Sequence, residues 1–140
     1  MRNVVQSFRA QAEAQARELI QAIEGAEAVI VSSIERECEA LRAGQMLAAE
    51  ALRVRLRDAA KLYVNLIRAA RASIWTLEQV LPGTADYLDG RRAAFNALLR
   101  VELAVLAAER AAAGPPNVPA EAASNVTPLR RVRKRRRRAG

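Results

Sequence analysis

The chain has 140 residues, only five of them aromatic, and no histidine. This length allows one domain, and the alanine-rich apolar fraction predicts a thin, helix-derived core. The lack of histidine removes the commonest acid–base group near neutral pH and the commonest metal ligand. No Gly-rich phosphate loop, paired-cysteine pattern or nucleophile-elbow serine is present. We therefore expect a protein that is not an enzyme and has no cofactor, metal site or small-molecule substrate.

A long amphipathic pattern begins near the N-terminus. From Val5 to Leu81 an apolar or small residue recurs every three or four positions, including Phe8. The mean spacing is about 3.6 residues, which indicates straight, packed helices more than a long left-handed coiled coil. The pattern predicts helix over about residues 3–80. Cys38, the single cysteine, falls on the apolar stripe and is expected to be a small core residue.

Charge divides this helical run into two halves. Residues 13–50 have eight acids and three arginines, whereas residues 51–71 have six basic residues and one acid. Placing the halves side by side, within one chain or across an antiparallel dimer, would bring opposite charges together. A turn near Gly44 would allow this pairing because glycine tolerates the left-handed conformation that ends many helices. A continuous helix of about 115 Å remains the alternative.

One acidic and one basic cluster on this helical run could each have either a structural or a functional role. Glu27, Glu35, Glu37 and Glu39 predict a solvated acidic face more than a metal or proton site. Arg53, Arg57 and Lys61 lie on one stripe, where pairing with the acidic half is favoured over a second phosphate contact. The aromatic residues Tyr63 and Trp75 are expected to be packing residues.

A firm boundary follows at Pro82-Gly83, because proline disfavours helix in the preceding residue and cannot donate inside a helix. Thr84 or Asp86 is the expected N-cap of a last helix over about residues 86–112. This helix is apolar around much of its circumference, so it is expected to pack within the chain and against another subunit. The expected oligomer interface consists of Phe95, Leu98, Leu99, Val105 and Leu106.

The composition changes after Ala113. Residues 114–129 contain four prolines and predict a linker. The segment 130–140 is an Arg-rich tail, with eight basic residues at 130–138. Removing these eight from the 23 basic residues leaves 15, equal to the 15 acids, so the whole net charge of +8 lies in the tail. Such a dense run of like charge is expected to be disordered until a polyanion compensates it.

These features predict an all-α protein of two or three long amphipathic helices, as a hairpin, bundle or coiled-coil-like oligomer, with a disordered basic tail. Domain 1–113 would oligomerise and the tail would bind DNA or RNA without sequence specificity. The expected nucleic-acid contacts are the tail's basic side chains: Arg130, Arg131, Arg133, Lys134, Arg135, Arg136, Arg137 and Arg138.

An adaptor or structural protein is the alternative. In it the apolar last helix binds a helical protein partner, and the tail docks on an anionic membrane surface or an acidic protein. A component of a viral particle or of a membrane-associated machine fits the same pattern. No window of 18 apolar residues and no secretion signal is recognised, so a cytoplasmic location is expected.

Overall fold

The computed structural model describes residues 2–114, which are all-α, as predicted. It contains α1 (Arg2–Arg42), α2 (Met46–Ala72), the short α3 (Ile74–Val80) and α4 (Thr84–Ala113). No strand occurs in this part of the chain. The amphipathic period of the sequence is thus realised as long helices joined by tight turns.

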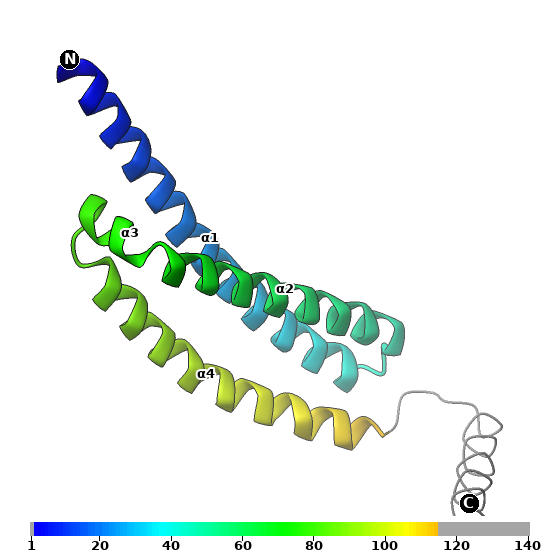
Figure 1. Ribbon diagram of the computed structural model, residues 1–140. Coiled ribbons are helices and arrows are strands. Elements are labelled where there is room, and N and C mark those ends of the chain that lie inside the picture. The colour runs from blue at the N-terminus through cyan, green and yellow to red at the C-terminus, as the bar shows by residue number, and fades with distance from the viewer. Residues whose placement is uncertain (1, 115–140) are drawn as a thin grey trace, which may run out of the picture.

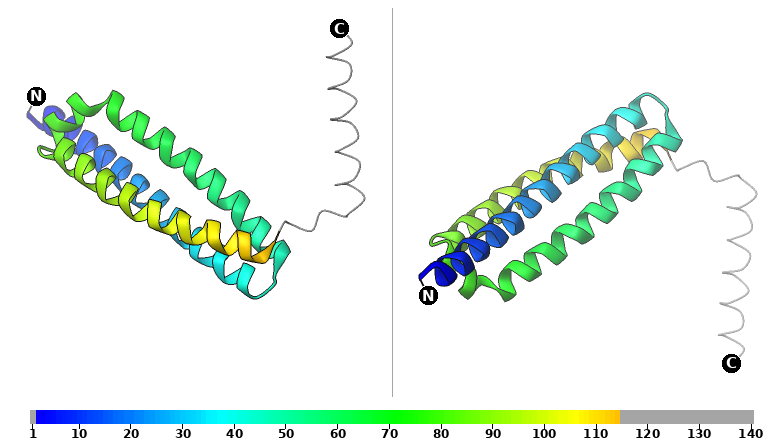
Figure 2. Two further views of the ribbon diagram at one scale, coloured as in Figure 1. Left: turned by 90° about the horizontal axis from the view of Figure 1, so that it is seen from below. Right: turned by 90° about the horizontal axis from the view of Figure 1, so that it is seen from above.

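Helix α1 is the element on which the other long helices pack (Figure 1). The chain reverses after α1, so α2 runs antiparallel to it, and α4 returns parallel to α1 (Figure 2). No Cα atom of α2 lies within 8 Å of a Cα atom of α4. Helices α2 and α4 are therefore held together mainly through α1. The first turns of α1 project past α3 (Figure 1).

The long helical run is interrupted twice. Gly44 has a left-handed φ of 71°, and the Gln45 N–H donates to the Ala40 carbonyl at 2.8 Å, which closes the turn between α1 and α2. A second interruption, at Ser73, was not predicted. There the Ser73 backbone has φ −107° and ψ 12°, and its hydroxyl donates to the Ala69 carbonyl. This hydroxyl competes with the helical hydrogen bonds of the backbone.

The start of α4 differs from the prediction that Thr84 or Asp86 caps it. Gly83 occupies the N-cap position with φ 91°, and Thr84 is the first helical residue. The hydroxyl of Thr84 donates backward to the Leu81 carbonyl. Two N–H groups at the start of the helix donate instead to Glu78 of α3, whose carboxylate accepts from Gly83 at 2.8 Å and from Ala85 at 2.9 Å.

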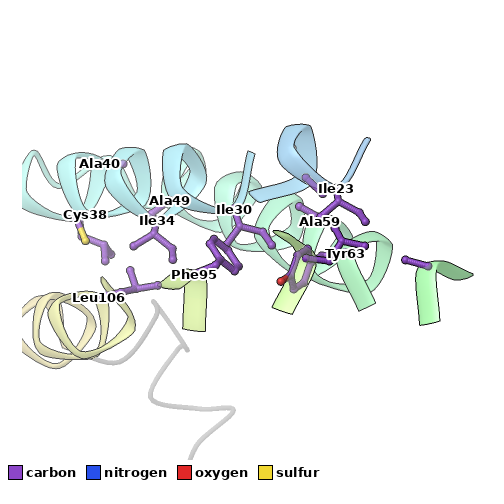
Figure 3. Packing of buried hydrophobic residues seen from close by; sticks show 14 of the residues in the cluster. Ile23, Ile30, Ile34, Cys38, Ala40, Ala49, Ala59, Tyr63, Phe95 and Leu106 are labelled. Atoms are coloured by element: carbon purple, nitrogen blue, oxygen red, sulfur yellow. The ribbon is translucent and has the colours of Figure 1, made fainter. Parts of the chain in front are cut away.

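The core lies where α1, α2 and α4 converge. Figure 3 shows Ile30, Ile34 and Cys38 of α1 pointing toward Phe95 and Leu106 of α4. Cys38 is buried, as expected. The rings of Tyr63 and Phe95 lie 5.0 Å apart between their centroids and connect α2 with α4.

Some apolar residues of the predicted stripe remain outside the core. Val5 and Phe8 are 66% and 68% exposed, because the first turns of α1 extend beyond the other helices. Trp75 is 75% exposed, so the prediction that it is a packing residue is wrong. Helix α3, which contains Trp75, runs in a different direction from α2 (Figure 1). No helix within residues 2–114 combines the length and hydropathy needed to cross a membrane.

Candidate functional site

The predicted nucleic-acid contacts at positions 130–138 lie outside the described residues. The structure does describe the end of α4, the helix that precedes these C-terminal positions in the chain. Helix α4 ends at Ala113, and Gly114 has a φ of 80° that stops the helix. Because α4 carries the chain toward its C-terminal segments, the contacts that hold its last turns determine how firmly that attachment point is placed.

The deepest of these contacts is an ion pair centred on Glu37 of α1, whose side chain has no exposed surface. The Arg110 guanidinium of α4 donates to both carboxylate oxygens, with N–O distances of 2.7 and 2.9 Å. Arg53 of α2 lies 3.7 Å from the same carboxylate. A bidentate arginine–carboxylate pair is strong and directional. Glu37 thus links α1 to both neighbouring helices.

A second polar contact lies about three turns nearer the start of α1. Glu27, which is 5% exposed, accepts a hydrogen bond from Nε of Arg91 at 2.6 Å. The Tyr87 hydroxyl donates to Glu24 at 3.1 Å and accepts from Arg91 at 3.3 Å. The bond to Glu27 raises the pKa of Arg91 above its usual value. The first half of α4 is therefore also held on α1 by charge-assisted hydrogen bonds.

A third contact fastens the end of α1 to the end of α4. Arg42 donates to Glu109 at 2.8 Å, and this bond raises the pKa of Arg42. Cys38 lies one turn earlier, and burial raises the pKa of its thiol. A thiol held in its neutral form is a poor nucleophile and a poor metal ligand. Cys38 therefore belongs to the core, between these polar contacts.

The predicted solvated acidic face is only half correct. Glu35 and Glu39 are exposed, but Glu27 and Glu37 are buried and paired. Their partners, Arg91 and Arg110, lie on α4. Neither arginine was predicted as a partner, because the net charge of the segments favoured pairing the acidic half of the helical run with its basic half. A usable signal was available for the carboxylates, since both lie beside the apolar stripe of α1.

The basic residues of α2 pair less than expected. Arg53 approaches Glu37, whereas Arg57 and Lys61 of the same predicted stripe form no ion pair within 4.0 Å among residues 2–114. Both side chains are exposed. The pairing of α1 with α2 is therefore mainly apolar, and the two buried carboxylates of α1 pair with arginines of α4. The positive charge of α2 remains on the surface.

The five predicted interface residues occupy different environments. Phe95 and Leu106 are 6% and 1% exposed and pack inside the chain. Leu98 and Val105 are 46% and 42% exposed, and Leu99 is half-buried. Of the five, Leu98 and Val105 offer the most surface to another molecule. Their role in an interface remains a prediction.

The described residues contain no group of three or more acidic, cysteine or histidine side chains placed to hold a metal ion. The expectation that the protein is not an enzyme stays a prediction. No family model, curated protein or solved structure matches the chain.

Proposed function

We propose that the protein is a non-enzymatic helical oligomerisation module that binds nucleic acid non-specifically through its Arg-rich C-terminal tail. The helices would form a bundle completed by other copies, and each copy would contribute one tail. Several tails on one assembly would raise the avidity for a polyanion well above the affinity of a single tail. Condensing nucleic acid, or anchoring a complex to it, would use this arrangement.

The distribution of charge carries this proposal. The 15 basic and 15 acidic residues of segment 1–129 balance, and the net charge of +8 lies within nine positions. Seven of the eight basic residues are arginine, whose planar guanidinium pairs phosphate with two hydrogen bonds. Positions 130–138 contain no aromatic residue for base stacking, which favours phosphate contact over sequence recognition.

The helical part of the chain supports the proposal in two ways. The Arg110–Glu37 and Arg42–Glu109 pairs hold the end of α4, so the linker departs from a fixed place on the body. Exposed apolar side chains on α4, including Leu98, Val101 and Val105, supply surface for contact between copies. A module of this kind combines self-association with a basic tail, and neither property requires a catalytic group.

The test is a fluorescence-anisotropy titration of DNA and RNA duplexes at several salt concentrations. The full chain is compared with a full-length variant in which the eight basic residues of positions 130–138 are replaced by serine. If all eight charges contact duplex phosphates, log affinity should fall against log salt with a slope of about −7. The serine variant should lose this binding. Light scattering on both proteins measures the oligomeric state.

A charge-preserving control separates arginine geometry from charge. Replacing the seven tail arginines by lysine should keep most of the affinity and the salt slope, because non-specific phosphate contact depends mainly on charge. Equal binding by the wild-type and serine proteins would overturn the assignment of the tail. Failure of the full chain to bind at physiological salt would overturn the nucleic-acid proposal itself.

The exposed apolar residues of α4 also favour the alternative function, a helical adaptor whose tail docks on anionic lipid or an acidic protein. Basic residues gain about 1 kcal/mol each near an anionic leaflet, which is enough for eight of them to hold a protein there. Flotation with phosphatidylserine vesicles, at the salt used for the titration, distinguishes the two. Flotation without duplex binding would favour the adaptor.

A further inference from the structure

An open groove of about 520 Å³ lies between α2 and α4. Its apolar lining comes from all three long helices and includes Ile30, Leu56, Tyr63, Ile67, Leu99 and Leu103. A smaller hollow of about 210 Å³ shares Ile67, Arg71 and Arg92 with the groove and extends it toward Leu88. The two hollows form one continuous surface along both helices.

The length of this surface suits a helix. Its lining extends over positions 56–71 of α2, Ile74 of α3 and positions 85–103 of α4. At 1.5 Å per residue the α4 stretch rises about 27 Å, the length of about 18 helical residues, and the α2 stretch rises about 22 Å. The Cα atoms of α2 and α4 lie more than 8 Å apart throughout, so a helix laid between them could contact both. The surface therefore has the dimensions of a helix-binding groove.

The charge of the groove indicates what kind of helix it fits. Arg68, Arg71 and Arg92 line it, and none of them forms an ion pair within 4.0 Å among residues 2–114. Asp89 is the one carboxylate along this lining in the described part of the chain. An apolar floor with positive edges is complementary to an apolar helix face flanked by carboxylates.

Other segments of the same chain have the wrong charge or composition for this groove. The projecting turns of α1 carry Arg2 and Arg9 and no acid before Glu13. Segment 115–129 has four prolines and one acid, and the tail is basic. Two copies docked groove to groove would bring two net positive linings together, since each has three arginines and one carboxylate. The groove's charge therefore favours a different protein.

We propose that the α2–α4 groove binds an amphipathic helix of about 18 residues from a partner protein, with acidic residues along both edges of its apolar face. The apolar face would cover Tyr63 and Leu103, and the carboxylates would pair with Arg68, Arg71 and Arg92. This inference does not rest on the tail, so it can hold or fail independently of nucleic-acid binding.

The probe is a fluorescein-labelled, 18-residue helical peptide of leucine, alanine and glutamate, with one leucine stripe flanked by glutamates. The protein is the full chain with its eight tail charges replaced by serine, which removes the tail's attraction for an acidic peptide. We expect saturable binding. A peptide of the same composition in scrambled order, and one with lysine in place of glutamate, should each bind at least about tenfold more weakly.

Matched variants locate the site. Leu103→Glu introduces a charge into the groove, whereas Leu62→Glu changes a similarly exposed leucine of α2 that does not line it. The first should weaken peptide binding at least about tenfold and the second should leave it unchanged. Circular dichroism checks that each variant is folded. Val64→Glu, at another exposed lining position, replaces Leu103→Glu if that variant unfolds.

Charge reversal tests the polar edges in the same way. Arg68→Glu with Arg71→Glu should weaken binding, whereas Arg55→Glu with Arg57→Glu, outside the groove, should not. Unchanged binding by the groove variants, or equal binding of the scrambled peptide, would overturn the proposal. So would a self-associated chain that excludes the peptide and dissociates on Leu103→Glu, since the occupant would then be a second copy.

Discussion

The two sides of α1 are packed by different means. Toward α2 the contact is mainly apolar: three of the four buried α2 residues are Ala49, Ala59 and Ala70, and larger residues such as Leu52 and Leu66 are half-buried beside them. Toward α4 the buried residues are larger, including Phe95 and Leu106, and they alternate with ion pairs. One helix thus presents an apolar, small-residue seam on one side and a seam with buried charge on the other.

This difference assigns different roles to the two seams. Alanine lets helix backbones approach closely, so α2 gains dispersion contacts over its length but few directional ones. The pairs between α1 and α4 join particular positions, which disfavours sliding or rotation of α4. We therefore expect the α2 seam to respond to changes in volume and the α4 seam to respond to changes in charge.

Removing an ion pair between α1 and α4 should have the largest effect on stability. Arg110→Met removes the bidentate partner of Glu37 and leaves a buried carboxylate with only Arg53 nearby, at 3.7 Å. We expect the free energy of unfolding to fall by about 2 to 4 kcal/mol, below the full range for a buried pair because Arg110 is partly exposed. Urea unfolding followed by circular dichroism measures the change.

The control is Arg57→Met, an exposed arginine of α2 without an ion pair in the described chain, which should change stability by less than about 0.5 kcal/mol. Relative to wild type, Arg110→Met should speed amide hydrogen exchange more in α4 than in α2. Equal loosening of both helices would show that the two seams are not separate.

Placing a larger side chain between α1 and α2 should have an intermediate effect on stability. Ala49 is 2% exposed, so Ala49→Leu forces three extra carbon atoms between α1 and α2. We expect a loss of about 1 to 3 kcal/mol, whereas Ala48→Leu at the exposed neighbouring position should be nearly neutral. Thermal unfolding of both variants checks this. A stable Ala49→Leu protein would indicate that the seam is loosely packed.

Most of the helical pattern was predictable because it depends on local periodicity. The apolar residues of α1 between Ile23 and Leu41 were placed on one face and are buried there. The spacing of apolar residues does not tell how far along a helix its neighbours extend. Phe8 was therefore assigned to the apolar stripe, although no other helix packs against the first turns of α1. The interruption at Ser73 depends on one hydroxyl competing for a backbone carbonyl, a signal too common in sequences to be decisive.

The pairing of charges was harder to predict than the helices. Net charge per segment suggested that the acidic residues of α1 face the basic residues of α2. Ion pairing instead depends on which side chains point inward, and Arg91 and Arg110 do so from a helix with no net charge excess. The groove was also not predictable, since it exists only because α2 and α4 each pack on α1 with their backbones apart.

The smallest expected effect concerns the joint that orients α4 beside α1. The N–H groups of Ala85 and Gly83 donate to Glu78 and lower its pKa below 4.5. Because the folded pKa lies below the unfolded one, this stabilisation is complete above about pH 4.5 and is lost as the pH falls through the folded pKa. Glu78→Gln should therefore lower the melting temperature near pH 6, and the difference from wild type should vanish in acid. Melting curves between about pH 2.5 and 6 measure this, with exposed Glu50→Gln as control. A difference independent of pH would mean that the carboxylate's charge does not hold the start of α4, and that the ion pairs along α1 alone fix its position.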